Sequence, residues 1–323
     1  MKISIKTAIQ TLSIIGIAVS VLVSVSCIFD TEPPLPGYPA KIDESISFSG
    51  IGSPDLCKCM SDNKLALVAA GSDLVVVDMV NGNKSVIDIG LEVDDIADSD
   101  GNGFGYVLAD SLVYPVNLSS ATAGNPINVG VSCSYISLSS DADTAWLAMD
   151  NDSIGILDLT TSEFTTVKSI SIKNCQGIAI ADSILFIADG SSNLILAYET
   201  DQWSEVGRIP VPGAVQDLFP GISGYICAIV DGSNELWFIK SDNCSLYKMI
   251  TFPVIPTAAA SMPDASYAYA ACPGTGMVIV AESGQMELRT ADFGLPSSID
   301  VTSDGSMAVV CSPENEAVYI LVR

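Results

Sequence analysis

The stretch Ile184 to Glu199 reads ILFIADGSSNLILAYE, and its two apolar runs, ILFIA and LILAY, flank a polar turn that contains Gly190. Two apolar runs joined by a short glycine-containing turn are typical of an antiparallel β-hairpin. An isolated hairpin cannot bury both of its faces. The rest of the chain must therefore supply the surfaces that cover this one.

The same pattern of two apolar runs around a turn recurs along the chain. Its other copies are LALVAAGSDLVVVD from Leu65, GYVLADSLVYPV from Gly105, AWLAMDNDSIGILD from Ala145, YICAIVDGSNELWFI from Tyr225, YAYAACPGTGMVIV from Tyr267 and MAVVCSPENEAVYIL from Met307. Copies spaced by about 40 residues match the repeat length of a four-stranded propeller blade. We therefore expect an all-β chain that folds as a seven-bladed β-propeller.

Each repeat should run from an inner strand A through strands B and C to an outer strand D. The segment Ser47 to Gly52 reads SFSGIG and resembles SVIDIG, the expected strand D that ends at Gly90. It has no strands A to C before it, whereas the last repeat lacks a strand D. We expect the N-terminal strand to complete the seventh blade and remove exposed sheet edges. The expected units are 53–90, 91–130, 131–172, 173–213, 214–252, 253–293, and 294–323 with 43–52.

The N-terminal residues differ from the repeats. Residues 1–26 have a short basic head and a long apolar run, as a secretory signal peptide has. The run ends at Ser24-Val25-Ser26-Cys27, which resembles the lipobox of bacterial lipoproteins, although Ser24 stands where that motif prefers Leu. The resemblance implies that Cys27 is lipidated; a plain cleaved signal and a retained anchor helix are the alternatives.

Residues 27–42 contain four prolines and should form an extended tether between the lipid and a propeller at 43–323. On this interpretation the protein belongs to the cell envelope, anchored to a bacterial membrane and facing the periplasm or the cell exterior.

The composition excludes several functions. The chain has 38 acidic and 13 basic residues, a net charge of −25 and no histidine. So few basic residues argue against a nucleic-acid partner, because little charge is available to neutralise phosphates. Without histidine, the chain lacks the commonest general base and the commonest transition-metal ligand.

The phrases YVLAD, LFIADGSSN and AIVDGSN resemble the YVTN and NHL classes of β-propeller repeat. Asp78 and Asp158 match the aspartate that often ends strand C in those repeats. The resemblance covers about residues 43–323 and implies the propeller fold. It implies no single function, because these classes include lactone-hydrolysing enzymes, surface-layer proteins and binding scaffolds.

Aspartates recur at the end of strand B in four units, where they could cap the B-to-C turn. Alternatively, B-to-C and D-to-A loops share one face of a propeller, so the four would form an acidic rim with three aspartates near the start of strand A. The candidate ligand or metal residues are Asp110, Asp150, Asp189 and Asp231 at the ends of strand B, and Asp94, Asp95 and Asp217 near the start of strand A. Oxygen ligands favour a divalent cation such as calcium.

A second calcium candidate is the run Asp98 to Gly103, which matches the first half of an EF-hand loop. It has Ala109 where that loop needs a bidentate glutamate.

Eight cysteines follow Cys27, and most fall inside expected strands, where small buried residues are the simplest interpretation. Cys133 and Cys175 begin strand A in neighbouring units. This placement makes them a candidate thiol pair, either a disulfide or a shared site for a soft metal.

Two functions are compatible with these residues. The first is a membrane-tethered, non-enzymatic binding or scaffold propeller with a protein or small-molecule ligand on one face. The second is a lactonase-like hydrolase that uses a metal held by the acidic face. The resemblance supports the second only weakly, because related lactonases draw on histidine and arginine.

Overall fold

Seven separate sheets make up the described part of the chain. The computed structural model describes residues 38–98, 102–167, 170, 172–221, 224–282, 285–290 and 293–323. These residues belong to a unit that begins at Tyr38. The expected signal peptide, Cys27 and most of the tether lie outside the described residues.

Each sheet is antiparallel, and six of the seven use strands that are consecutive in the sequence. Blade 1 contains β2 (Leu56–Cys59), β3 (Leu65–Ala70), β4 (Asp73–Asp78) and β5 (Lys84–Asp88). Blade 2 contains β6 (Asp95–Asp98), β7 (Phe104–Ala109), β8 (Leu112–Asn117), β9 (Thr122–Ala123) and β10 (Ile127–Asn128). Blade 3 contains β11 (Cys133–Leu138), β12 (Thr144–Met149), β13 (Ser153–Asp158) and β14 (Phe164–Val167). Blade 4 contains β15 (Cys175–Ala181), β16 (Ile184–Asp189), β17 (Leu194–Glu199) and β18 (Glu205–Pro210).

The remaining three blades follow the same plan. Blade 5 contains β19 (Val215–Pro220), β20 (Tyr225–Val230), β21 (Glu235–Lys240) and β22 (Leu246–Thr251). Blade 6 contains β23 (Ala258–Ser261), β24 (Ala268–Cys272), the 3₁₀ turn Pro273–Thr275, β25 (Met277–Glu282) and β26 (Gln285–Thr290). Blade 7 contains β27 (Ser298–Val301), β28 (Met307–Ser312), β29 (Ala317–Val322) and β1 (Lys41–Ser47). The fold is therefore a seven-bladed β-propeller, as the repeats predicted.

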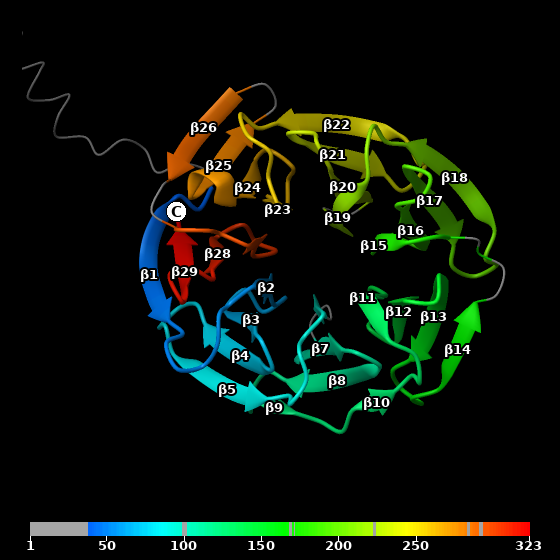
Figure 1. Cartoon of the computed structure of the whole chain (residues 1–323), viewed down its shortest axis with the longest axis horizontal. Coiled ribbons are helices and arrows are strands. Elements are labelled where there is room, and N and C mark those ends of the chain that lie inside the picture. Colours follow the sequence, from blue (N-terminus) through cyan, green and yellow to red (C-terminus); the bar gives the residue numbers. More distant parts are fainter. Residues whose placement is uncertain are drawn as a thin grey trace, which may run out of the picture. The chain divides into compact units, whose positions relative to one another are not determined.

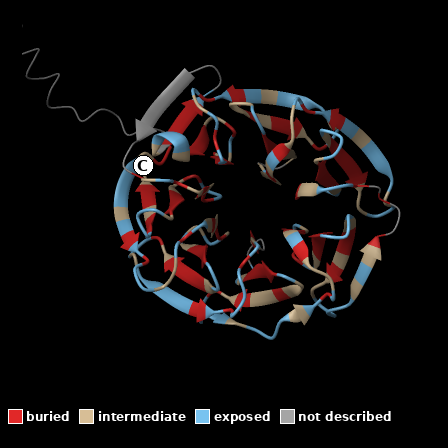
Figure 2. Cartoon of the chain, viewed as in Figure 1, coloured by how far each residue is buried: buried red, intermediate tan, exposed pale blue. Residues whose placement is uncertain are grey.

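Burial explains why the second and third strands read as continuous apolar runs. In β3 and β4 the central residues are buried on both faces, whereas in the outer strand β5 only Ile87 is buried. A blade packs against a neighbour on each side, so alternation disappears from its central strands. Figure 2 shows exposed segments concentrated on the outer strands and loops.

The seventh blade closes the ring with the N-terminal strand, which lies beside β29 (Figure 1). The strand itself is Lys41–Ser47, however, and not the predicted 47–52. Gly50 has a φ of 81°, a left-handed conformation that turns the chain toward blade 1. Phe48 is still fully buried, just beyond the end of the strand. The pattern SFSGIG therefore marked the end of the closing strand and the turn after it.

The A-to-B turns share one backbone requirement. Each contains a residue with positive φ: Asn63, Gly103, Ala142, Asp182, Gly224, Ala265 and Gly305. Glycine, asparagine and aspartate tolerate this conformation, as expected from the turn sequences, but Ala142 and Ala265 adopt it too. The repeated geometry thus overrides local preference in blades 3 and 6.

Within the described residues, no helix is long and apolar enough to span a membrane.

Candidate functional site: the central channel

The seven inner strands face the axis of the ring (Figure 1). They are β2, β6, β11, β15, β19, β23 and β27, and residues from all seven line a cavity of about 670 Å³. A smaller depression of about 390 Å³ adjoins it and shares the lining residues Tyr135, Gln216 and Thr257. We call these two adjoining volumes the central channel. The depression lies on the side of the B-to-C turns, because Asp231 lines it.

Carboxylates dominate the charge of this channel. Its acidic lining residues are Asp55, Asp94, Asp95, Asp98, Asp182, Asp217 and Asp300. Lys58 is the only basic residue among those that line it, and its ammonium lies 3.4 Å from a carboxylate oxygen of Asp300. The only lysine of the lining is therefore already paired, and the acidic lining residues outnumber it seven to one.

Burial and neighbouring charge shift the pKa values of these groups. Burial raises the pKa of Asp95 to about 7, although hydrogen bonds from the N–H groups of Ile136 and Ile96 oppose the rise. Burial also raises the pKa of Asp217 to about 6, against the attraction of Lys58. Burial opposes the charge of Lys58 itself, but Asp300 and the other carboxylates outweigh it and raise the pKa of the lysine.

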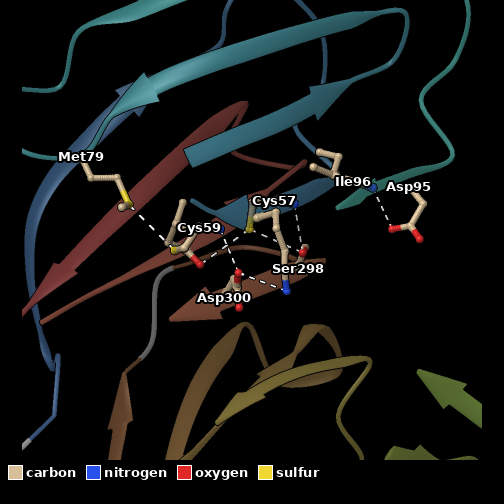
Figure 3. A network of polar contacts seen from close by, with 9 residues as sticks. Cys57, Cys59, Met79, Asp95, Ile96, Ser298 and Asp300 are labelled. Carbon is tan, nitrogen blue, oxygen red and sulfur yellow. Dashed lines mark hydrogen bonds and ion pairs between the residues drawn. The ribbon is translucent and has the colours of Figure 1, made fainter. Parts of the chain in front are cut away.

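Several side chains of the inner strands form hydrogen bonds to the adjacent blade (Figure 3). Strand A is the innermost strand of each blade, so half of its N–H groups have no partner strand. Ser298 and Asp300 of blade 7 accept hydrogen bonds from the N–H groups of Cys57 and Cys59 in blade 1, at 3.1 and 2.8 Å. Asp95 of blade 2 accepts one from Ile136 of blade 3 at 2.8 Å. Each bond satisfies a buried donor that would otherwise destabilise the fold.

The structure brings together only some of the predicted rim. Asp94, Asp95 and Asp217 line the channel, and Asp231 lines the adjoining depression. Asp110, Asp150 and Asp189 are not among the lining residues of either volume. The B-to-C and D-to-A loops do meet on one face, because Asp94 accepts a hydrogen bond from the N–H of Asp110 at 2.6 Å.

The four aspartates of the B-to-C turns have partners close to each turn. Asp189 accepts hydrogen bonds from the N–H and hydroxyl of Ser191 and from the hydroxyl of Ser192, and these bonds lower its pKa despite its burial. Asp110 accepts a hydrogen bond from the hydroxyl of Ser132, and Asp150 accepts one from the hydroxyl of Ser134. Asp231 accepts one from the side-chain amide of Gln216.

No group of three or more Cys, Asp or Glu side chains within the described residues is placed to hold a metal ion. Of the run Asp98 to Gly103, residues 99–101 lie outside the described residues.

Cys133 and Cys175 are free thiols in the structure. The thiol of Cys133 donates to the carbonyl of Val131 at 3.3 Å, and that of Cys175 donates to Gly177 at 3.6 Å. Burial raises the pKa of the two thiols to about 12 and about 11. Both thiols are therefore protonated at neutral pH and poor nucleophiles in this state.

Sequence reasoning missed Lys58, Asp55, Asp98, Asp182 and Asp300 as channel residues. One signal was available for Lys58: it lies between Cys57 and Cys59 on an expected inner strand, so its side chain points away from the two buried thiols. Asp300 carried no comparable signal, because the ring brings it to Lys58 from the far end of the chain.

Comparisons with known proteins support the fold. The described propeller resembles hydrazine synthase from Kuenenia stuttgartiensis, with a TM-score of 0.69, 13% sequence identity, and coverage of 91% of this chain and 99% of that one. At this identity the likeness concerns the fold alone. No protein-family model matches the chain, and no curated protein matches it. The YVTN or NHL character of the repeats stays a prediction.

Proposed function

We propose that this chain is a non-enzymatic binding protein that takes a positively charged small molecule into its central channel. The observation that carries the proposal is the charge of the cavity: seven aspartates line it, and its only lysine is paired with Asp300. Its volume of about 670 Å³ lies within the range typical of ligand pockets. Low-dielectric walls around like charges concentrate the field and favour a ligand of opposite sign.

An organic cation fits the channel better than a metal ion. Calcium needs six or more oxygen ligands at short range, whereas no three Cys, Asp or Glu side chains of the described residues are grouped to hold a metal ion. An ammonium group needs only one or two acceptors for its N–H donors. The lining carboxylates offer such acceptors at several separate places along the cavity.

The channel also offers little for nucleophilic catalysis. The sequence contains no histidine to act as a general base. Burial raises the pKa of the Cys59 thiol, which lines the cavity, well above its ordinary value, so this thiol does not ionise readily at neutral pH. These features support a binding function over the lactonase-like alternative.

We further propose that a lipid on Cys27 tethers the propeller to a bacterial membrane, facing the periplasm or the cell exterior. The support comes from the sequence: the apolar residues 1–26, the lipobox-like segment that ends at Cys27, and the proline-rich residues that follow. A ligand or protein partner would then be met outside the cytoplasm.

Isothermal titration calorimetry tests the binding function, with spermidine as a cationic probe, citrate as an anionic probe and calcium as a metal probe. Spermidine should bind and raise the melting temperature, and citrate should not. The control variant is Asp43→Asn, which makes the same change in net charge on the exposed closing strand. It should bind spermidine as the wild type does. Binding of citrate, or a loss of spermidine affinity in Asp43→Asn as large as that in an Asp95→Asn/Asp217→Asn double variant, would show that the channel is not the site. Calcium binding without spermidine binding would favour the metal alternative.

A further inference from the structure

The seven repeats provide an internal comparison for every residue of strand A. Within each blade, the first regular pair of the A–B ladder joins Asp95 to Leu108 in blade 2, Asp217 to Ile229 in blade 5 and Ser298 to Cys311 in blade 7. These three residues therefore occupy one repeat position, and their side chains leave the strand on the side of the next blade.

In two blades the side chain at this position bonds to the next blade. Asp95 accepts the N–H of Ile136 in blade 3, and Ser298 accepts the N–H of Cys57 in blade 1. The repeat-equivalent donor in blade 6 is Ala259, which lies opposite Ala270 just as Ile136 lies opposite Leu147. Asp217 should thus bond to Ala259 if blade 5 followed the same rule.

Asp217 departs from this rule. Its carboxylate accepts a hydrogen bond from the N–H of Leu218, the next residue in its own strand. Within the described part of the chain, it accepts no hydrogen bond from blade 6. The carboxylate has an acceptor capacity of about four lone-pair sites, and Asp217 is one of the residues that line the cavity.

The side chains that form the cavity wall next to Asp217 are small. The inner strand of blade 6, β23, reads Ala258-Ala259-Ala260-Ser261, and both Ala258 and Ala259 line the cavity with Asp217. Their methyl groups cannot donate a hydrogen bond to the carboxylate. A ligand in the cavity can therefore approach Asp217 beside β23, at a repeat position where blades 2 and 7 make an inter-blade bond.

We propose that Asp217 anchors the ligand by accepting hydrogen bonds from an ammonium group seated in the channel beside β23. This inference rests on the proposed function and names the residue and the ligand chemistry. Primary and secondary ammonium groups supply the N–H donors that Ala259 and its neighbours do not deliver to Asp217.

The electrostatic surroundings of Asp217 agree with such a partner. The groups that act on its charge are Lys58, which stabilises the carboxylate, and Asp300, which disfavours it. Burial is the largest influence and raises its pKa to about 6. A bound ammonium would offset that burial by placing a positive charge in hydrogen-bond contact with the carboxylate.

The test compares variants at equivalent repeat positions by calorimetry with spermidine. Asp217→Asn should lower the affinity at least tenfold, while Asp95→Asn should change it by less than threefold because its oxygens are already engaged by two backbone N–H groups. Asp217→Glu, which keeps the carboxylate, should recover part of the loss. The melting temperature of unliganded Asp217→Asn should not fall, since no inter-blade bond is removed.

The outcomes separate the two proposals. No spermidine binding by the wild type would overturn the proposed function and, with it, the role of Asp217. Wild-type binding that Asp217→Asn and Asp95→Asn weaken equally would keep the channel as a cation site but overturn the assignment of the anchor to Asp217. A melting temperature of Asp217→Asn well below that of the wild type would show that the residue is structural.

Discussion

The carboxylate of Asp300, on the last blade, accepts a hydrogen bond from the backbone N–H of Cys59, on the first blade, at 2.8 Å. The same carboxylate lies 3.4 Å from the ammonium of Lys58. One side chain thus satisfies a free N–H of the innermost strand and neutralises the only lysine of the channel. It does so at the joint where the ring closes.

Asp300→Ala should therefore destabilise the protein. We expect a loss of about 1–3 kcal/mol, because a buried N–H and a partly buried ammonium both lose their acceptor. Denaturant unfolding measures the change. Asp300→Asn is the matched variant: it keeps an oxygen for the N–H of Cys59 and should lose less. An alanine variant as stable as the wild type would mean that the bond to Cys59 contributes nothing to ring closure.

The closing strand offers a second stability test within a single element. Ile46 is 5% exposed and packs in the joint between blades 7 and 1, whereas Ile42 of the same strand is 37% exposed. Ile46→Ala should cost about 2–4 kcal/mol in the free energy of unfolding, and Ile42→Ala well under 1 kcal/mol. Thermal melts of the two variants measure the difference. Similar losses would argue against the observed register, in which Ile46 pairs with Val318.

The stability of the propeller should depend on the ionisation of Asp95. Its pKa is raised by burial to about 7, so between about pH 4 and pH 7 the folded protein holds a proton that the unfolded chain has released. Its contribution to stability is therefore greatest at the acidic end of this window and is lost as the pH rises through 7. We expect the melting temperature of Asp95→Asn to fall less than that of the wild type between pH 5 and pH 8. Parallel profiles would contradict the raised pKa.

Removing the only lysine of the channel should strengthen cation binding. Lys58→Met leaves Asp300 without its counter-ion and removes one positive charge from the cavity wall. A unit charge at ~10 Å with an effective dielectric constant of ~20 is worth about 1–2 kcal/mol, or roughly tenfold in affinity for spermidine. The same variant should melt at a lower temperature, because the ion pair is lost. Unchanged or weaker spermidine binding would exclude an electrostatic origin of the affinity.

Lipidation of Cys27 has a direct test. Cys27→Ala should abolish the incorporation of a labelled fatty acid and release the protein from the membrane fraction, because the thiol is the site of attachment. Cys133→Ala provides a control that changes a cysteine of the propeller instead. Labelling of the Cys27→Ala variant at the wild-type level would contradict the proposed anchor.

The repeats made the blades predictable, but they did not make the closing strand predictable to the residue. Paired apolar runs and their spacing identified each B–C hairpin, since both are local properties of the chain. The segment SFSGIG matched the end of a strand D, yet the paired residues are Lys41–Ser47. Only Ile46 within that strand is buried, so an exposed outer strand leaves a weak apolar pattern.

The sequence alone determined the seven four-stranded units, the closure of the last blade by an N-terminal strand, and the acidity of the chain, because hairpins, repeat length and charge are all written in neighbouring residues. The tertiary structure alone decided which charged groups meet in the channel. Cys59 and Asp300 are 241 residues apart, and their hydrogen bond exists only because ring closure places the first and last inner strands side by side. Tertiary contacts also distinguish Asp95, whose carboxylate bonds to the next blade, from Asp217, which lines the cavity and makes no such bond within the described residues. Two aspartates that share one repeat position thus differ because the next blade supplies different neighbours to each.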